Sequence, residues 1–250
     1  MKVGIIGTGV IGATFARALA KKGIEVWVTE RGRSHSAALA ASHGVTVADN
    51  QAVADACEVI CLCVRPEVAG DIVKGLNFRP DQRIVSAMTK LDIDQLIQLC
   101  APATNFVRTI PFEFVDKGGC PLPAFGNVDL LNELFGPDNV IIPVADEAAL
   151  NAHFSACTVL PATLDLIATA ESWLTSRTGD GDGAGTYVTQ LVSGYLDSMS
   201  RQGANRAAEE RDAIATSGTL SLQMVETLRE AGMHNGAVQG FESIEERLKS

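Results

Sequence analysis

The stretch that decides the fold is KVGIIGTGVIG, from Lys2 to Gly12. A short β-branched segment leads into glycines at positions 7, 9 and 12, and a helical pattern follows until Gly23. In such a unit the first glycine permits a tight turn, the second lets a pyrophosphate approach the backbone, and the third lets the helix pack closely on the strand. The glycine spacing occurs by chance in many loops, but its flanking strand and helix predict a dinucleotide-binding turn. That turn comprises Gly7, Thr8, Gly9, Val10, Ile11 and Gly12.

The second predicted strand ends in TERGRSHS, and its Glu30 lies 18 residues after Gly12. A carboxylate at this distance can accept hydrogen bonds from the adenosine ribose, which favours NAD. Arg31 can stack on adenine, whereas Arg33 and Ser34 can bind the 2′-phosphate of NADP. One carboxylate facing two guanidinium groups leaves a net attraction for phosphate. The stretch therefore permits both cofactors, and NAD(P)H is the expected one.

The organisation of the chain changes at about residue 148. Before it, strands alternate with helices of about ten residues, which predicts a parallel, doubly wound sheet. After it, the patterns are helical. We therefore predict an α/β fold: a Rossmann-type dinucleotide-binding domain over residues 1–148, followed by an all-helical dimerisation and substrate domain over residues 149–250. In the second domain GDGDGAG (Gly179–Gly185) is expected to be an interhelical loop, and Trp173 and Tyr187 are expected to pack between helices.

Composition excludes several classes of protein. Hydrophobic residues make up 46% of the chain and charged residues 20%, which is typical of a globular protein. The formal charge of −10 argues against nucleic acid or an anionic membrane as partner. No apolar stretch is long enough to span a membrane, and the N-terminus resembles a strand rather than a signal peptide, so we expect a cytoplasmic protein. The six cysteines lack metal-type spacing, so no metal is expected.

The whole chain resembles the pyrroline-5-carboxylate reductases, enzymes that reduce a cyclic imine to proline. Four segments carry the likeness: GTGVIGATFARALAKKG, CLCVRPEVAGDIV, NFVRTIPFEFVDKGG and TSGTLSLQMVETLREAG. The resemblance implies an NAD(P)H-dependent reductase of proline biosynthesis that is a homodimer through its C-terminal helices. It also implies cofactor contacts from a strand end and the helix after it, at Val64, Arg65 and Pro66, with Arg65 in place of the family's lysine. Pro111 and Ser221 are the implied substrate-binding residues, and Glu113 is a further candidate because it directly follows Phe112 after Pro111.

The chain departs from the family at several points that concern the substrate. Phe112 stands in place of the asparagine that follows the family's proline. The family's Gly-Ser-Gly-Pro-Ala-Tyr helix start is Thr158–Thr163 here, of which only Pro-Ala is retained. A paralogue that reduces a different imine or carbonyl compound is therefore an alternative. A cofactor-binding regulatory protein without catalysis is another.

A reductase of this kind needs little acid–base chemistry, because the reduced nicotinamide carries the hydride and an iminium carbon is already electrophilic. A neutral hydroxyl beside the nitrogen is sufficient to orient it. Ser221, which matches the second threonine of the family's Gly-Gly-Thr-Thr element, is the first catalytic candidate and Thr158 the second. Either residue could instead be a helix N-cap. Glu113 would suit a cationic substrate or be a solvated loop acid, and Arg108 could hold an anion or pair with an acid. A related hydroxyacid dehydrogenase would need a lysine in residues 154–177, which contain none.

Overall fold

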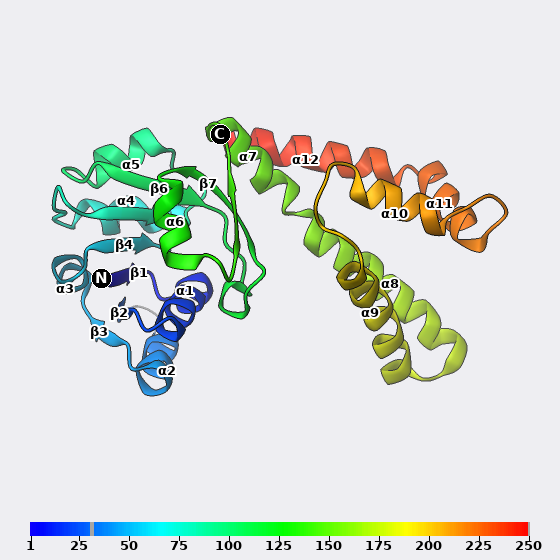
Figure 1. Cartoon of the computed structure of the whole chain (residues 1–250), viewed down its shortest axis with the longest axis horizontal. Coiled ribbons are helices and arrows are strands. Elements are labelled where there is room, and N and C mark those ends of the chain that lie inside the picture. Colours follow the sequence, from blue (N-terminus) through cyan, green and yellow to red (C-terminus); the bar gives the residue numbers. More distant parts are fainter. Residues whose placement is uncertain (31–32, 250) are drawn as a thin grey trace. The chain divides into compact units, whose positions relative to one another are not determined.

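The computed structural model describes residues 1–30 and 33–249 and divides into two compact units (Figure 1). Unit 1 comprises Met1–Phe154 together with the chain from Glu246 onward, and unit 2 comprises Ser155–Glu245. The domain boundary drawn from the sequence at residue 148 stays a prediction. No helix in the described part of the chain is both long and apolar enough to cross a membrane.

Unit 1 is built on one sheet of eight strands in the order β3-β2-β1-β4-β5-β6-β7-β8 (Figure 1). All neighbouring strands are parallel except β6 and β7, which are antiparallel. The strands are β1 (Lys2–Ile6), β2 (Glu25–Thr29), β3 (Thr46–Ala48), β4 (Val59–Leu62), β5 (Arg83–Ser86), β6 (Asn105–Thr109), β7 (Pro121–Gly126) and β8 (Val140–Pro143). This order confirms the predicted Rossmann-type, doubly wound sheet.

Helices cover both faces of the sheet. The helices of unit 1 are α1 (Val10–Lys21), α2 (Arg33–His43), α3 (Asn50–Ala56), α4 (Pro66–Lys74), α5 (Ile93–Leu99), the 3₁₀ helix η1 (Val115–Lys117), α6 (Val128–Phe135) and α7 (Glu147–Ala156), whose last two residues belong to unit 2. Alternate residues of each central strand face opposite sides, so in β4 Cys61 joins the core cluster with α1, α2 and α6. Its neighbour Leu62 joins the second cluster, with α3, α4 and α5.

Strand β7 was not predicted from the sequence. It contains Pro121 and Pro123, which lack the N–H group that a ladder needs, so the local pattern gives little sign of a strand. Tertiary pairing nevertheless holds it between β6 and β8. The sheet therefore continues beyond the parallel core through one antiparallel step.

Unit 2 is helical, as predicted. Its helices are α8 (Val159–Thr178), α9 (Gly181–Ser198), α10 (Arg206–Ile214), α11 (Leu220–Glu230) and α12 (Met233–Lys249), the last of which ends in unit 1. The expected loop over residues 179–185 is wrong: only Gly179 and Asp180 separate α8 from α9. Asp180 accepts a hydrogen bond from the Gly183 N–H at 2.9 Å and so caps α9. This cap stabilises the start of a helix that includes the glycines after Asp180.

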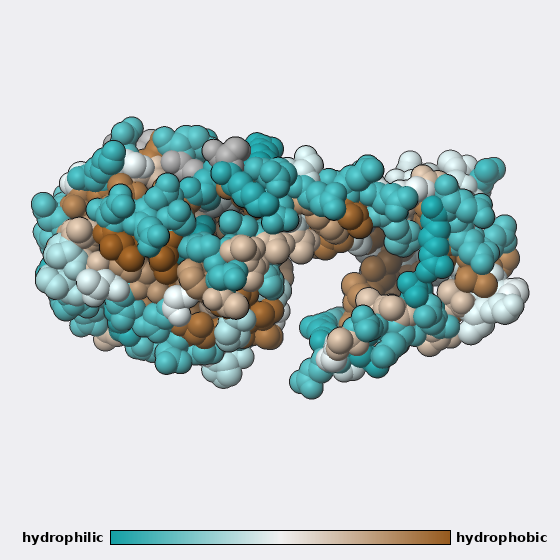
Figure 2. Space-filling view, turned by 90° about the horizontal axis from the view of Figure 1, so that it is seen from above, coloured by the Kyte–Doolittle hydropathy of each residue, from teal (hydrophilic) through white to brown (hydrophobic). Residues whose placement is uncertain are grey.

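The core of unit 2 is small. Among its described apolar residues only Ala184 and Val188 are buried. Trp173 and Tyr187 are both 61% exposed, so the expectation that they pack between helices is wrong for the single chain. Brown, hydrophobic surface is accordingly visible over the helices of this unit (Figure 2).

Candidate active site

The loop after β1 requires glycine at two positions. Gly7 has φ +100°, a conformation that favours glycine, and a Cβ there would lie 2.7 Å from the Cys63 carbonyl oxygen. A Cβ on Gly12 would lie 2.1 Å from the Gly7 carbonyl oxygen, because α1 packs directly on the turn. Gly9 differs, since a Cβ there would meet no atom within 4 Å. The space beside Gly9 is therefore open to a ligand rather than filled by the fold.

Two threonines hold this loop against the end of β2. The Thr8 hydroxyl is buried and donates to the Thr29 carbonyl at 2.7 Å. The Gly7 N–H donates to the Thr29 hydroxyl at 3.1 Å. Thr29 was not among the predicted site residues, because its contacts join positions 22 residues apart. The clamp fixes the glycine turn beside Glu30.

Helix α1 begins after Gly9, which has no side chain to cap it. Its first N–H groups therefore have no partner within the helix and carry its partial positive charge. Val10 is half exposed and Ile11 packs against the core. An uncapped helix start beside open space at Gly9 fits a pyrophosphate, as the sequence predicts.

Two neighbouring hollows beside α4 contain the two predicted parts of the cofactor site, the glycine turn and Glu30. The first, of about 220 Å³, is lined by the turn glycines and by His35, Val64 and Arg65. The second, of about 560 Å³, is lined by Glu30 and the start of α3. Ile72 lines both, so the hollow at the glycine turn and the hollow at Glu30 are neighbours. His35 and Ile72 are lining residues that glycine spacing could not identify.

The residues predicted to choose between NAD and NADP lie at the Glu30 end. Glu30 is exposed, and its N–H donates to the Ala48 carbonyl at 3.2 Å. Ser34 lies in the first turn of α2 and is exposed. Arg31 lies outside the described residues, and Arg33 and Pro66 are described by their backbone alone. The structure therefore shows Glu30 at the second hollow, and the binding of a 2′-phosphate by Arg33 and Ser34 stays a prediction.

A thiol, that of Cys63, lies directly after the end of β4. Cys63 lines the first hollow and is partly buried. Burial raises the pKa of its thiol to about 12, because the thiolate would lose its hydration. At neutral pH this group is an uncharged, weakly reactive side chain.

The end of β6 carries the predicted substrate residues of unit 1. Pro111 is partly buried and Glu113 exposed, on the loop that leads from β6 to η1. Phe112 packs against the same core cluster as Ile11 of α1. The Glu113 carbonyl lies 3.5 Å from the Thr14 hydroxyl, so this loop runs from the end of β6 to the first turns of α1.

Arg108, in contrast, does not face solvent. Its side chain is 3% exposed, forms an ion pair with Glu147, and approaches the Met88 carbonyl at 3.4 Å. Glu147 also accepts a hydrogen bond from the Ile93 N–H at 2.9 Å. Burial lowers the pKa of the guanidinium, although Glu147 opposes that shift. Of the two roles considered for Arg108, pairing with an acid is the one observed.

The two hydroxyl candidates for catalysis lie in unit 2. Thr158 directly precedes α8 and donates to the Ser155 carbonyl at 2.7 Å. Ser221 is exposed in the first turn of α11, and the N-cap of that helix is Thr219, which accepts from the Leu222 N–H at 3.2 Å. Neither hydroxyl is therefore used as an N-cap, and the catalytic role of both stays a prediction.

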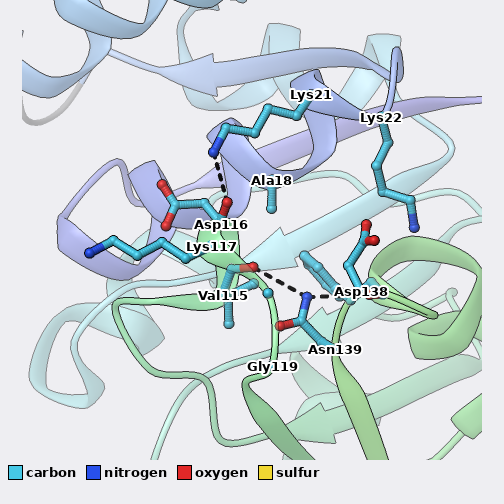
Figure 3. Close-up of a pocket in the computed structure, with 11 residues that line it drawn as sticks. Ala18, Lys21, Lys22, Val115, Asp116, Lys117, Gly119, Asp138 and Asn139 are labelled. Atoms are coloured by element: carbon cyan, nitrogen blue, oxygen red, sulfur yellow. Dashed lines mark hydrogen bonds between the residues drawn. The ribbon is translucent and has the colours of Figure 1, made fainter. Parts of the chain in front are cut away.

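A further hollow of about 470 Å³ lies at the opposite end of α1 from the glycine turn (Figure 3). Three lysines line it, and two of them, Lys21 and Lys22, have partners in the fold. Lys21 donates to the Asp116 carbonyl at 2.7 Å, and Lys22 donates to the Gly136 carbonyl at 2.6 Å. These contacts tie α1 to η1 and to the end of α6, so Lys21 and Lys22 stabilise the fold.

Comparison with known proteins agrees with this geometry. Residues 2–90 match the family model described as NADP oxidoreductase, coenzyme F420-dependent, which confirms a domain of the NAD(P)-binding type. No protein of curated function matches the sequence.

The solved structures that resemble the chain extend the likeness over both units. The pyrroline carboxylate reductase of Plasmodium falciparum, solved with NADP bound, has a TM-score of 0.83 at 17% identity over 100% of this chain and 97% of its own. The pyrroline-5-carboxylate reductase of Streptococcus pyogenes has a TM-score of 0.83 at 18% identity, with coverage of 100% and 98%. A reductive aminase of Aspergillus terreus, solved with NADPH, cyclohexanone and allyl amine, has a TM-score of 0.63 at 16% identity, with coverage of 99% and 92%. The chain therefore has the fold of the pyrroline-5-carboxylate reductases over its whole length, and its residues 2–90 are similar to an NADP oxidoreductase family.

Proposed function

We propose that the protein is an NAD(P)H-dependent reductase of a C=N bond, acting on pyrroline-5-carboxylate or a related cyclic imine. The observation that carries the proposal is the open, uncapped start of α1 at Gly9, together with the exposed Glu30, which lines a neighbouring hollow that shares Ile72 with the one at the glycine turn. Solved relatives of the same fold over the whole chain reduce imines. A cytoplasmic location belongs to this proposal, and so does a role in proline biosynthesis in the case that the substrate is pyrroline-5-carboxylate.

In the proposed reaction the bound cofactor supplies a hydride to the imine carbon. The glycine turn and the start of α1 hold the pyrophosphate, and Glu30 accepts hydrogen bonds from the adenosine ribose. Pro111 and Glu113 border the substrate from unit 1. The Ser221 hydroxyl orients the nitrogen of the protonated imine, with Thr158 as second candidate, and the π electron pair moves to that nitrogen to leave a neutral amine.

We propose that the active protein is a homodimer through α8–α12. Leu160, Leu164, Trp173 and Leu191 are each more than 40% exposed in the single chain, which is costly for helices of a water-exposed unit. A second copy of the same helices would bury these side chains by self-complementary packing. Sedimentation at micromolar concentration is expected to give twice the chain mass of 26.3 kDa, and a monomer at all concentrations would contradict the dimer.

The direct test is oxidation of NADH and of NADPH, measured in parallel with pyrroline-5-carboxylate as substrate. Turnover with either cofactor supports the reductase. Cofactor binding without turnover of any imine would instead favour the regulatory, non-catalytic alternative.

Glu30→Asn tests the cofactor assignment separately. Removing the carboxylate removes repulsion of a 2′-phosphate, so the NADPH to NADH efficiency ratio is expected to rise at least tenfold. Asp129→Asn, which removes an exposed carboxylate of α6 that lines neither hollow, is the control. An unchanged ratio in Glu30→Asn would refute the role of this residue.

A further inference from the structure

The loop after β6 holds Glu113 in a defined place. Phe112 and Phe114 pack against the core, with ring centroids 6.0 Å apart. The Thr14 hydroxyl donates to the Val10 carbonyl at 2.9 Å and lies 3.5 Å from the Glu113 carbonyl. Glu113 therefore stands between two anchored aromatic residues, about one helical turn from the uncapped start of α1.

This position is on the opposite side of the glycine turn from Glu30. Glu30 follows β2, whereas Glu113 follows β6, and β1 with its glycine turn lies between these strands in the sheet. If the adenosine lies at Glu30 and the pyrophosphate at Gly9, the nicotinamide extends toward the ends of β4, β5 and β6. In that arrangement the loop that carries Glu113 lies on the nicotinamide side of the glycine turn.

The charge of Glu113 is not compensated within the described part of unit 1. No hydrogen bond or ion pair of its carboxylate is found there, and the residue is exposed. The nearest cations of α1 are engaged elsewhere: Arg17 Nε lies 2.5 Å from Asp116 Oδ2, and Lys21 donates to the Asp116 carbonyl. An exposed carboxylate without a partner in that part of the chain consequently lies on the loop after β6, next to the first turns of α1.

We propose that Glu113 makes the enzyme selective for imines that carry no carboxylate beside the C=N bond and bind as iminium cations. This inference rests on the proposed reductase function. The Glu113 carboxylate attracts an iminium cation and repels an imine that bears its own carboxylate. The enzyme would therefore distinguish the two classes of imine by repulsion of one as well as by attraction of the other. Hydride addition to the iminium carbon sends the π electron pair to nitrogen and yields the amine, so no further reactant is needed. Because the substrate's positive charge is lost in this step, Glu113 acts on binding more than on the chemical step.

The test compares 1-pyrroline with 1-pyrroline-5-carboxylate, which differ only by the carboxylate, with NADH and NADPH each in excess. We expect kcat/KM to be at least tenfold higher for 1-pyrroline, with the difference in KM. Glu113→Gln is expected to reduce that ratio at least fivefold and Glu113→Lys to reverse it, with kcat little changed. Asp138→Asn, which removes the same charge at the far end of α1, is expected to leave the ratio unchanged.

The outcomes separate the two proposals. Preference for the carboxylate-bearing imine, or a ratio that is the same in wild type and both Glu113 variants, would overturn the inference but leave the reductase function standing. Absence of cofactor oxidation with either imine would overturn both.

Discussion

The contrast between Gly9 and Gly12 offers a test of why each glycine is present. A methyl group on Gly12 would lie 2.1 Å from the Gly7 carbonyl oxygen, more than 1 Å inside ordinary contact, so α1 must shift away from the turn. Overpacking of this kind costs about 1–3 kcal/mol, and the clash with backbone places Gly12→Ala at the upper end. A unit of this size loses about 2–4 °C of Tm per kcal/mol, so we expect a fall of about 6–12 °C.

Gly9→Ala should behave in the opposite way. Its methyl group meets nothing within 4 Å. Alanine is less favourable than glycine at an N-cap position, but it also lowers the conformational entropy of the unfolded chain, and the two effects on the free energy of unfolding partly cancel. Its Tm should change by about 3 °C or less. The methyl group would occupy the approach of the pyrophosphate, so the Kd for NADH and NADPH should rise about tenfold or more, a loss of about 1.4 kcal/mol. Thermal melting and nucleotide fluorescence titration measure the two effects. Unchanged affinity in Gly9→Ala, or a wild-type Tm in Gly12→Ala, would refute the reasoning.

Two further predictions concern buried groups of unit 1. Glu147→Gln leaves the guanidinium of Arg108 buried without its counter-charge; because Glu147 is 27% exposed, the free energy of unfolding should fall by about 3 kcal/mol, the lower end for a broken buried pair. Denaturant unfolding measures this free energy, and the double variant Arg108→Met with Glu147→Gln should recover most of the stability that Glu147→Gln alone loses. A double variant as unstable as Glu147→Gln alone would show that the unpaired Arg108 charge is not the cause of the loss. Alkylation of Cys63 in the folded protein should be about 10³-fold slower at pH 8 than that of a free thiol, since a pKa of about 12 leaves about 10⁻⁴ of it as thiolate. The rate should increase about tenfold per pH unit up to pH 11 and decrease when NADH is bound, and peptide mapping that showed rapid labelling at pH 8 would contradict the buried state.

Much of unit 1 could be predicted because its signals are local. The glycine turn, the strand that ends at Glu30 and the helix closed by Gly23 each depend on residues within a few positions of one another. Strand β7 could not be predicted, since Pro121 and Pro123 argue locally against a strand that only its neighbours stabilise. Tertiary pairing overrides propensity there.

The site was predicted less completely than the fold, for the same reason. The Thr29 clamp and the Arg108–Glu147 pair join residues far apart in sequence, and neither has a spacing that recurs locally. The exposure of Trp173 was also unpredictable, because an apolar helix face has the same pattern whether its own chain or a second molecule covers it.

The return of the chain to unit 1 after the helices has a consequence for synthesis. Arg247, Leu248 and Lys249 line a hollow together with Arg108 and Glu147, yet they are translated after the whole of unit 2. A nascent or truncated chain that stops before residue 246 has every strand of the sheet but an unfinished wall beside the buried ion pair. Folding of unit 1 can therefore be completed only after the last turn of α12 has been synthesised. A stop codon just before that turn would leave unit 1 incomplete, although most of unit 1 is synthesised first.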